Sequence, residues 1–501
     1  MIFNIVILLF DLLKYDKILY NEGVDSAMQM SDDCKKKCQI FTPKNNVKEM
    51  LDWVGYSKNL YGKKIIEPSC GQGNILIDVI ERYIVDSLNN NYTKDEIRKG
   101  LSQDIYAIEY DTKHYNKCID NINKILKKYN IGKVDWNIYC EDSLKLDLKI
   151  KFDYVVGNPP YISYKMLDEQ TRKYVRETFK TCRKGKFDYC YPFIEKGVEL
   201  LKKGGKIAFL VPGSIFKNVF SGNLREYLKE DITDIYDYAT QKLFNEYATG
   251  EKKKILTSSI IFILKKGSKN DTLNYYNLDN ENKIEVEKKK FGTKWIFNEI
   301  SIGEKRFGDY FKVSNSIATL CNKAYVITEK DDLFYNKAEK KIIKNAVSPK
   351  SIESSKKEKI IFPYYYNSKD TLVRINKEKF SENFPCAEKH LKKFITELNN
   401  RKSDKNIQWF EYGRSQALND MDKPKLLLSI IVTGRIKPYI LSKDTIPYSG
   451  IYIIPKKNMT LEMAKKILES NEFLDYIKSV GINASGNSYR ITSKDISNYY
   501  F

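Results

Sequence analysis

The sequence predicts an α/β protein with a doubly wound, mostly parallel β-sheet, followed by a mixed α+β module. From about residue 39 to residue 265, short β-branched runs alternate with longer helical segments, which is the pattern of βαβ units. After a polar stretch at residues 265–272 this rhythm stops, and the rest of the chain is irregular and rich in Tyr, Lys and Asn. The sequence therefore predicts an extension and two domains, at residues 1–38, 39–268 and 269–501.

Short β-branched runs are expected to form the strands of the first domain. Examples are residues 63–69, 105–110, 136–142, 152–158, 206–212 and 258–266. Helices are expected between them, for example at residues 75–88 and 193–204. In a sheet of this kind, ligands bind at the carboxyl ends of the strands. The chemically active residues are therefore expected where these strands end.

The chain is strongly basic. Its 86 Lys and Arg against 65 Asp and Glu give a net charge of +21 over 501 residues, and 42% hydrophobic residues exclude a disordered chain. Such a surplus favours a polyanionic partner, nucleic acid first and an acidic membrane surface second. An AT-rich genome, whose codons favour Lys and Asn, accounts for part of the surplus, so the charge alone does not identify the partner.

The apolar N-terminus and the cysteines point to a cytoplasmic protein. Asp11 and Lys14 interrupt the apolar run at residues 1–20 before the ~18 apolar residues of a membrane span, and the run has no basic n-region or cleavage site. An amphipathic helix or an overextended start is expected there, with no membrane partner. The 9 cysteines form no CxxC pair and only 2 His are present, so no metal site is expected and free thiols fit a reducing compartment.

Ligand-type residues follow the first three strands. Glu67 is followed by Cys70, Gly71 and Gly73, and two glycines one residue apart allow a tight turn and close backbone approach to a ligand. Glu109 ends the second strand, where an acid can bind ribose hydroxyls. The third strand ends in residues 141–143, and an acid there can accept a hydrogen bond from an adenine amino group. Each acid alone is typical of a helix N-cap, but three in register indicate an adenosine-containing cofactor.

The fourth strand ends in Asn158-Pro159-Pro160-Tyr161. The two prolines end the strand and stiffen the loop, so that Asn158 is held at the sheet edge. Its side-chain oxygen and the Pro159 carbonyl can accept both hydrogen bonds from one NH₂ group, which makes that nitrogen a better nucleophile. Tyr161 offers a face on which a planar base or amide can stack. A plain rigid turn is the alternative, and the cofactor pattern before it favours the functional interpretation.

Together these segments resemble the S-adenosylmethionine-dependent amino-methyltransferases. More narrowly, the chain is similar to the gamma-class DNA adenine methyltransferases of restriction–modification systems, which are TaqI methylase-like enzymes with an NPPY motif. Residues 39–43 (QIFTP) and 187–216 resemble further parts of the catalytic domain, and residues 309–327, 409–415 and 486–500 resemble the target-recognition domain. The resemblance implies a Rossmann-like methyltransferase sheet followed by a DNA-binding domain.

The resemblance also implies roles for individual residues. The residues that would contact S-adenosylmethionine are Thr42, Glu67, Cys70, Gly71, Gly73, Glu109, Asp142 and Ser143. Asn158, Pro159 and Pro160 would hold the target amine, and Tyr161 would stack on an adenine rotated out of the helix. Phe244 is the candidate for the second aromatic against that base. Two positions depart from the family: Ile75 stands where Phe is usual, and Leu320 replaces the usual Gly.

The expected function is methylation of the exocyclic 6-amino group of adenine in double-stranded DNA, by a monomer. A separately encoded restriction endonuclease is the expected partner, and an orphan methylase is equally compatible. Asn before Pro-Pro-Tyr favours adenine over the amine of cytosine, and Pro385-Cys386 lies too far from the sheet pattern to serve carbon-5 chemistry. The alternatives are an RNA or protein-glutamine methyltransferase, or a decayed DNA-binding specificity component.

Overall fold

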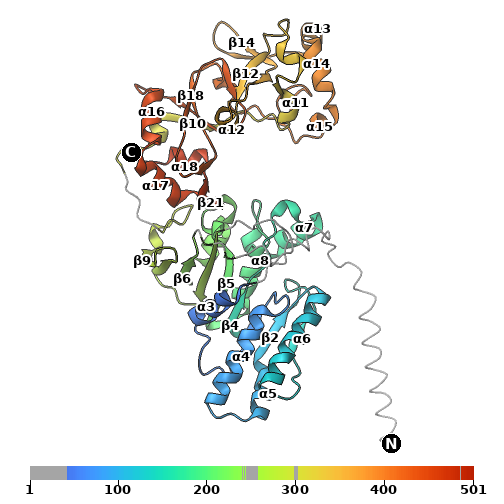
Figure 1. The fold of residues 1–501 in the computed structure, drawn as a ribbon, viewed down its shortest axis with the longest axis vertical. Helices are drawn as coiled ribbons and strands as arrows, with labels where there is room; N and C mark the ends of the chain where they lie inside the picture. The colour runs from blue at the N-terminus through green and yellow to red at the C-terminus, as the bar shows by residue number, and fades with distance from the viewer. Residues whose placement is uncertain (1–41, 240, 242, 244–257, 298–302, 486) are drawn as a thin grey trace, which may run out of the picture. The chain divides into compact units, whose positions relative to one another are not determined.

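The computed structural model describes residues 42–239, 241, 243, 258–297, 303–485 and 487–501 (Figure 1). The chain divides into two compact units, one up to Trp295 and one from Ile296 onward. The sequence places this division at residues 268/269, where the polar stretch lies. The structural division comes later because the two strands that follow the polar stretch add to the sheet of the first unit. The expected extension at residues 1–38 lies outside the described residues.

The first unit is built on a nine-stranded sheet with the order β3-β2-β1-β4-β5-β7-β6-β8-β9. Its strands are β1 (Ile65–Glu67), β2 (Ile105–Ile108), β3 (Asn137–Tyr139), β4 (Phe152–Gly157), β5 (Leu201–Pro212), β6 (Ile232–Asp237), β7 (Ser259–Lys265), β8 (Thr272–Asn277) and β9 (Asn282–Glu287). The strands from β3 to β5 are all parallel, whereas β7 runs antiparallel to both β5 and β6. The predicted α/β class with a mostly parallel sheet is confirmed.

Helices cover both faces of this sheet. They are α3 (Lys44–Val54), α4 (Asn74–Asn89), α5 (Lys94–Asp104), α6 (Thr112–Lys128), α7 (Glu169–Thr178), α8 (Cys190–Leu200) and α9 (Gly222–Leu228). Along β5, Ala208 and Leu210 join the hydrophobic cluster of α3, α4 and α6, while Ile207 and Phe209 lie against Gly197 of α8. Successive side chains of one strand thus serve opposite faces, which is the doubly wound arrangement.

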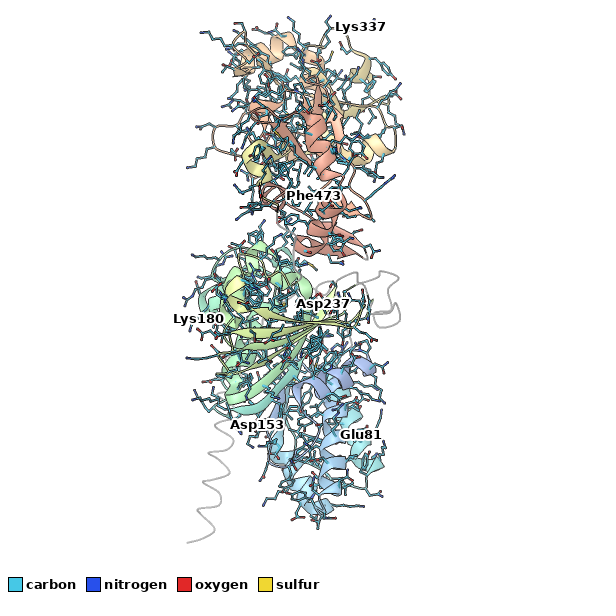
Figure 2. All side chains as sticks on the ribbon, turned by 90° about the vertical axis from the view of Figure 1, so that its left-hand side faces the viewer. Glu81, Asp153, Lys180, Asp237, Lys337 and Phe473 are labelled. Atoms are coloured by element: carbon cyan, nitrogen blue, oxygen red, sulfur yellow. The ribbon has the colours of Figure 1, made fainter. Side chains whose placement is uncertain are left out.

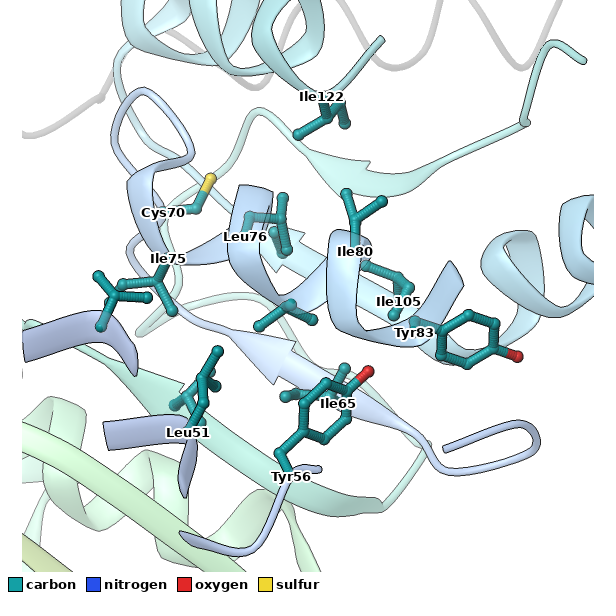
Figure 3. Close-up of a cluster of buried hydrophobic side chains, with 14 of the residues drawn as sticks. Leu51, Tyr56, Ile65, Cys70, Ile75, Leu76, Ile80, Tyr83, Ile105 and Ile122 are labelled. Carbon is teal, nitrogen blue, oxygen red and sulfur yellow. The ribbon is translucent and has the colours of Figure 1, made fainter. Parts of the chain in front are cut away.

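The core under α4 positions the turn that follows β1. Ile75, Leu76 and Ile80 of α4 pack with Ile65 of β1 and Ile105 of β2, all 2% exposed or less (Figure 3). Ile75, the departure from the family's Phe, is therefore a core residue. Complete burial of a side chain of this size contributes about 1.5–3 kcal/mol, so the start of α4 is firmly held.

The helix predicted at residues 75–88 corresponds to α4, but the one predicted at residues 193–204 ends early. In the structure α8 stops at Leu200, and the chain continues directly into β5. Gly204 has φ +79°, and its N–H donates to the carbonyl of Lys266 rather than to a helical partner. A left-handed residue of this kind ends a helix or marks an irregularity in a strand, so the apolar pattern alone misplaced this boundary.

The second unit combines short helices with several small sheets, as the predicted mixed α+β module requires. Its sheets have the orders β10-β20-β16-β18, β11-β13-β12-β19, β14-β15 and β17-β22-β21. The strands are β10 (Phe311–Asn315), β11 (Val326–Thr328), β12 (Ile343–Val347), β13 (Glu358–Ile361), β14 (Tyr364–Tyr366), β15 (Leu372–Arg374), β16 (Lys425–Leu428), β17 (Ile431–Thr433), β18 (Tyr439–Leu441), β19 (Thr445–Pro447), β20 (Ile451–Pro455), β21 (Ile482–Ser485) and β22 (Ser488–Arg490). The helices are α10 (Phe307–Tyr310), α11 (Asn322–Tyr325), α12 (Pro349–Glu353), α13 (Lys377–Asn383), α14 (Pro385–Lys392), α15 (Ile395–Asn399), α16 (Leu461–Leu468), α17 (Asn471–Val480) and α18 (Ser493–Ser497).

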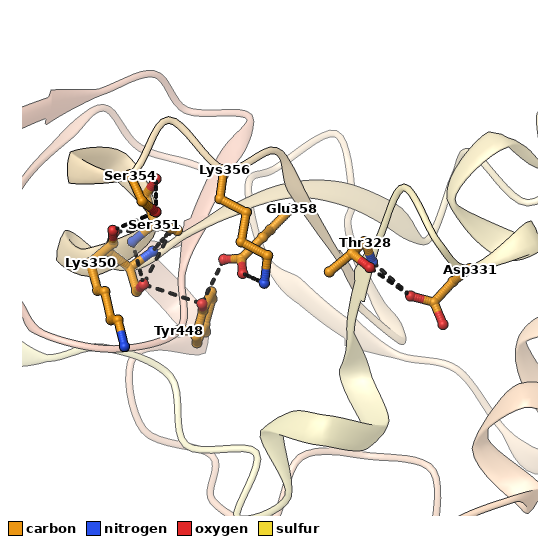
Figure 4. A network of polar contacts seen from close by, with 9 residues as sticks. Thr328, Asp331, Lys350, Ser351, Ser354, Lys356, Glu358 and Tyr448 are labelled. Atoms are coloured by element: carbon orange, nitrogen blue, oxygen red, sulfur yellow. Dashed lines mark hydrogen bonds and ion pairs between the residues drawn. The ribbon is translucent and has the colours of Figure 1, made fainter.

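A buried polar network holds the start of α12 in this unit (Figure 4). Ser348 caps the helix through a reciprocal pair of hydrogen bonds with Ser351. The hydroxyl of Tyr448 lies 3.2 Å from the hydroxyl of Ser348 and donates to the Glu358 carboxylate at 2.6 Å. Lys356 pairs with the same carboxylate at 2.9 Å, so the charge of the buried Glu358 is compensated.

Leu320, where the family resemblance leads us to expect Gly, has a backbone conformation that glycine favours. Its φ is +58°, in the left-handed region where a side chain costs roughly 1–2 kcal/mol. A Cβ on Gly413 would lie 2.6 Å from Leu320 Cδ1, so the leucine packs tightly over that glycine. The substitution therefore leaves the backbone in the conformation that glycine favours. Separately, none of the helices in the described ranges is both long and apolar enough to cross a bilayer.

Candidate active site

The predicted site residues gather at one edge of the large sheet. The strands β3, β2, β1 and β4 are parallel neighbours in that order, so their carboxyl ends lie side by side. The loops after them are tied together: Cys70 N–H donates to the Ile108 carbonyl at 3.0 Å, and Glu109 N–H donates to the Tyr139 carbonyl at 2.9 Å. Residues that lie far apart in the chain thus line a single edge.

Glu67 ends β1 with a buried carboxylate that is only partly satisfied. The residue is 3% exposed, and its Oε2 has no hydrogen-bond partner among the described residues. Burial raises the pKa of Glu67 well above its ordinary value, Cys118 and Glu109 raise it further, and the Leu76 N–H offsets this in part. A buried acceptor without a partner is costly and marks a place where a ligand can donate a hydrogen bond.

The two glycines of the turn are required for different reasons. Gly71 and Gly73 have φ values of +54° and +86°, which glycine adopts without a steric penalty. A Cβ on Gly73 would lie 2.8 Å from Cys118 Sγ, so this position is needed for packing against α6. A Cβ on Gly71 would meet nothing within 4 Å, so the backbone of Gly71 borders open space. Gly71 is therefore the glycine that a ligand can approach.

Glu109, directly after β2, fixes the turn. Its Oε2 accepts the Gly71 N–H at 2.7 Å and its Oε1 accepts the Asp111 N–H at 2.8 Å. Burial raises the pKa of this carboxyl, and the two backbone donors lower it in part. Each carboxylate oxygen has a further lone pair, so Glu109 can hold the turn and still accept hydrogen bonds from a ligand.

The segment after β3 carries two more unsatisfied acceptors. Asp142 Oδ1 accepts the Leu144 N–H at 3.0 Å, whereas Oδ2 and the Ser143 hydroxyl are buried without hydrogen-bond partners in the described part of the chain. Lys145 Nζ is 3.9 Å from Oδ2, beyond hydrogen-bond distance. Burial raises the pKa of Asp142. Both the carboxylate oxygen and the hydroxyl can therefore form a hydrogen bond with a ligand.

Asn158, directly after β4, contacts the start of the described chain. Its Nδ2 donates to the Thr42 hydroxyl at 3.2 Å, and its backbone carbonyl accepts a long hydrogen bond, 3.5 Å, from the Ser69 hydroxyl. Thr42 itself is 5% exposed. The segment after β4, the turn after β1 and the predicted N-terminal motif therefore meet at Asn158. Of that motif, residues 39–41 lie outside the described residues.

The rest of the segment after β4 is rigid. Pro159 is buried and Pro160 half-buried, and the Tyr161 hydroxyl donates to the Leu210 carbonyl of β5 at 2.7 Å. The Tyr161 ring packs against the core cluster of α3, α4 and α6. Burial raises the pKa of Tyr161 well above its ordinary value, and Cys190 and Asp188 raise it further. The Tyr161 phenol therefore stays neutral, and the hydrogen bond of its hydroxyl to Leu210 fixes the orientation of the ring.

Asp188, which the sequence analysis did not single out, lies beside this segment. Burial raises its pKa to about 6, although its Oδ1 accepts the Cys190 N–H at 3.1 Å. Asp188 pairs with Ser163 in an isolated antiparallel bridge, and the Tyr189 N–H donates to the Ile162 carbonyl at 3.0 Å. An acid at the start of a helix reads as an ordinary cap, so the sequence offered no signal that it lies next to Tyr161.

Two other candidates lie elsewhere. Phe244 falls outside the described residues. Pro385 and Cys386 begin α14 in the second unit, where the buried Glu339 accepts the N–H groups of Cys386 and Ala387 at 2.6 and 2.7 Å. Cys386 thus has a structural setting at a helix start. Within the described ranges, no three His, Cys, Asp or Glu side chains cluster in a way that could hold a metal ion.

Comparison with known proteins connects this edge with DNA methylases. Residues 57–244 match the family described as Eco57I restriction-modification methylase. The chain is 27% identical over 207 residues to the type II methyltransferase M.BstVI of Geobacillus stearothermophilus, covering 38% of this chain and 36% of that protein. It is 22% identical to the type II restriction enzyme and methyltransferase RM.Eco57I of Escherichia coli, covering 94% of this chain and 57% of that protein.

The fold over 91% of the chain is also similar to that of a solved structure. The type IIL restriction-modification enzyme MmeI, solved in complex with DNA, superposes with a TM-score of 0.60 at 13% identity, covering 91% of this chain and 64% of MmeI. At this identity the likeness concerns the fold alone. The chain spans 36% and 57% of the lengths of the two curated relatives named above. The chain is thus similar to restriction–modification methylases in sequence over residues 57–244 and in fold over most of its length.

Proposed function

We propose that the protein is a site-specific DNA methyltransferase that uses S-adenosylmethionine and modifies the 6-amino group of adenine. The observation that carries this proposal is Asn158-Pro159-Pro160-Tyr161, held at the sheet edge by Thr42 and Leu210 beside the glycine turn. The names of the relatives, which are type II methyltransferases, support the same reaction class.

The unsatisfied acceptors fit the proposed cofactor. Glu67 Oε2, Asp142 Oδ2 and the Ser143 hydroxyl are buried without hydrogen-bond partners among the described residues, and Gly71 borders open space. S-adenosylmethionine carries the matching donors, namely two amino groups and two ribose hydroxyls. When bound, it would supply an electrophilic methyl group for transfer to the target amine. The residues assigned to cofactor binding are Thr42, Glu67, Cys70, Gly71, Gly73, Glu109, Asp142 and Ser143.

Asn158 and Pro159 are proposed to hold the target amine. Thr42 orients the Asn158 amide through Nδ2, so the acceptor Oδ1 is at the opposite end of that amide. Oδ1 and the Pro159 carbonyl, kept in place by Pro160, would accept the two N–H groups of the amine. This directs the nitrogen lone pair out of the ring system and stabilises the positive charge that develops on the nitrogen.

Tyr161 is proposed to stack on an adenine rotated out of the duplex, with Phe244 on the other face. The hydrogen bond from the Tyr161 hydroxyl to Leu210 keeps the ring from rotating away, which suits a stacking platform. Asn rather than Ser before Pro-Pro-Tyr favours adenine over cytosine as the base. The proton that the methylated amine loses needs no base of unusual pKa.

The first unit is proposed to bind the cofactor and the target base, and the second unit to recognise double-stranded DNA. The net charge of +21 suits a polyanionic partner. The protein would act as a monomer, either with a separate cognate restriction endonuclease or as an orphan methylase.

The test is to express the full chain in a bacterial host that lacks adenine methylation and to sequence the host DNA by a method that detects methylated adenine. A single modified sequence motif is expected, and the Asn158→Ala variant should give none. Complete absence of methylated adenine, from a protein that binds S-adenosylmethionine in vitro, would contradict the proposal. Assays of RNA and of protein glutamine would then identify the substrate.

A further inference from the structure

The segment between α7 and α8 is strongly basic. Residues 180–186, the basic loop, carry exposed cations and no acid. The cations are Lys180, Arg183, Lys184 and Lys186. None of them forms an ion pair with a carboxylate in the described part of the chain. Lys180 marks the position of the loop on the first unit in Figure 2.

The basic run at residues 288–290 is neutralised locally. In the run at residues 288–290, Lys289 and Lys290 pair with Glu287 at 2.6 and 3.1 Å. Lys288 is 4% exposed and donates to the Glu230 carbonyl at 2.8 Å. The basic loop differs from that run because no ion pair compensates its four cations in the described part of the chain.

The tip of the basic loop is fixed from α7. Arg176 donates to the Gly185 carbonyl at 2.8 Å, and the same Nη2 donates to the Tyr164 hydroxyl at 3.1 Å. The Arg176 guanidinium also lies over the Tyr164 ring, 5.4 Å from its centroid. Tyr164 in turn meets Phe187 edge-on at 5.2 Å, directly after the loop. The path of the loop is therefore set by groups other than its own exposed cations.

The start of the loop is fixed from α8. The buried Glu195 accepts the N–H groups of Lys180 and Thr181 at 3.0 and 2.8 Å. Immediately after the loop, Asp188 pairs with Ser163, which is five residues beyond Asn158. Five extended residues span at most about 17 Å. The cations of the loop are thus held in a fixed relation to the segment that is proposed to receive the target base.

We propose that the basic loop binds the phosphates next to the target nucleotide and holds the DNA strand on both sides of the base that is rotated out. This inference rests on the proposed function, since it names the part of the DNA that this surface contacts. Phosphate contacts position a protein on a duplex without reading its sequence. Rotation of a base out of the stack costs a few kcal/mol, and contacts that hold the distorted strand offset that cost.

The test compares two variants of the full chain. The loop variant is Lys180→Gln, Arg183→Gln, Lys184→Gln and Lys186→Gln. The matched control replaces four exposed lysines on the segments that lead into β2 and β3, namely Lys94, Lys99, Lys127 and Lys133, by Gln. Both variants lose the same charge, so any difference between them reports the position of the charge.

The measurement is the affinity for a 30-base-pair duplex that contains the methylated motif, between 50 and 300 mM KCl. Each lost phosphate contact lowers the slope of log K against log salt by about 0.9, so the loop variant should lose about 2–4 in slope and the control less than about 1. S-adenosylmethionine binding, followed by calorimetry, should be unchanged in both. Equal slopes for the loop variant and the control would overturn the inference.

A second measurement uses the unaltered protein, so it does not depend on how the variants fold. Replacing the phosphates on either side of the target adenine by uncharged methylphosphonates should weaken binding about tenfold, with little effect at phosphates one helical turn away. No position-dependent loss would overturn the inference while leaving the proposed function intact. If instead the unaltered protein neither binds nor methylates DNA, the proposed function itself fails.

Discussion

The side chain of Asn158 donates a hydrogen bond of 3.2 Å to the hydroxyl of Thr42, although 116 positions separate the two residues in the chain. Thr42 is the first residue of the described chain, and Asn158 follows the central strand β4. The contact determines how the amide is oriented. Thr42 is therefore a positioning residue for Asn158 as well as a proposed cofactor contact.

Loss of the Thr42 hydroxyl should slow methyl transfer. Removing one hydrogen bond that orients a reacting group costs about 1–1.5 kcal/mol, so Thr42→Ala should lower kcat about tenfold at saturating cofactor. Thr42→Ser keeps the hydroxyl and should retain most of the activity. Single-turnover rates with the methylated motif measure both. Equal rates for Thr42→Ala and the unaltered protein would show that the contact does not orient Asn158.

Replacing Glu67 by Gln should stabilise the free protein and abolish its response to the cofactor. Burial holds the pKa of Glu67 in the folded protein above its ordinary value. The folded protein therefore keeps a proton that the unfolded chain releases, so stability is lost as the pH rises from the ordinary pKa through the raised one. At pH 7.5, Glu67→Gln removes this penalty and should gain about 1 kcal/mol, or about 2–4 °C in Tm. Thermal unfolding with and without S-adenosylmethionine tests both effects. A variant that is less stable than the unaltered protein, or that still gains Tm with cofactor, would contradict the assignment of Glu67.

The two glycines of the turn should separate folding from binding. Gly73→Ala introduces both a left-handed alanine and a collision with Cys118, so it should destabilise the first unit by about 2–4 kcal/mol. Gly71→Ala has space for its methyl group and should cost only about 1–2 kcal/mol. That methyl group occupies the open space above the turn, however, so cofactor affinity should fall at least tenfold. Calorimetric binding and Tm measured on both variants would detect a reversal of this pattern.

Asp188 should make stability depend on pH in the acid range. Its folded pKa, about 6, lies above the ordinary 3.8, so the folded protein keeps a proton that the unfolded chain releases. The contribution of Asp188 is therefore complete below pH 3.8 and is lost as the pH rises through about 6. Asp188→Asn can still accept the Cys190 N–H but cannot titrate. Its Tm relative to that of the unaltered protein should rise between pH 4.5 and pH 7, and a constant difference would refute this role.

The alternation of strands and helices predicted the class of the sheet and six of its nine strands, since each named β-branched run up to residue 266 became a strand, whereas β6, β8 and β9 were not among those runs. The order of the strands could not be predicted in this way. In the structure, β7 lies between β5 and β6 and runs antiparallel to both. This order depends on how the connections between the strands pack against the sheet, which the apolar pattern of the sequence does not specify. The polar stretch at residues 265–272 likewise suggested a domain boundary, whereas it connects β7 to β8, which pairs with β6 and with the edge strand β9.

The candidate site was predictable to the extent that it lies at strand ends. Glu67 ends a parallel strand, and Glu109, Asp142 and Asn158 follow three others, and parallel strands bring their ends together. Asp188 was missed because its position depends on a single bridge to Ser163, a contact between segments that no periodic pattern connects. The anchor from Arg176 to Gly185 was missed for the same reason.

That anchor makes the path and the charge of the basic loop independent of each other. Arg176, Tyr164 and Glu195 determine where the loop runs, while its four cations contribute no side-chain hydrogen bond or ion pair within the described structure. The cations can therefore be exchanged one by one without changing the path of the loop. Under the proposed function, this offers protein engineering a way to adjust the ionic strength at which the protein releases DNA without altering the proposed catalytic residues.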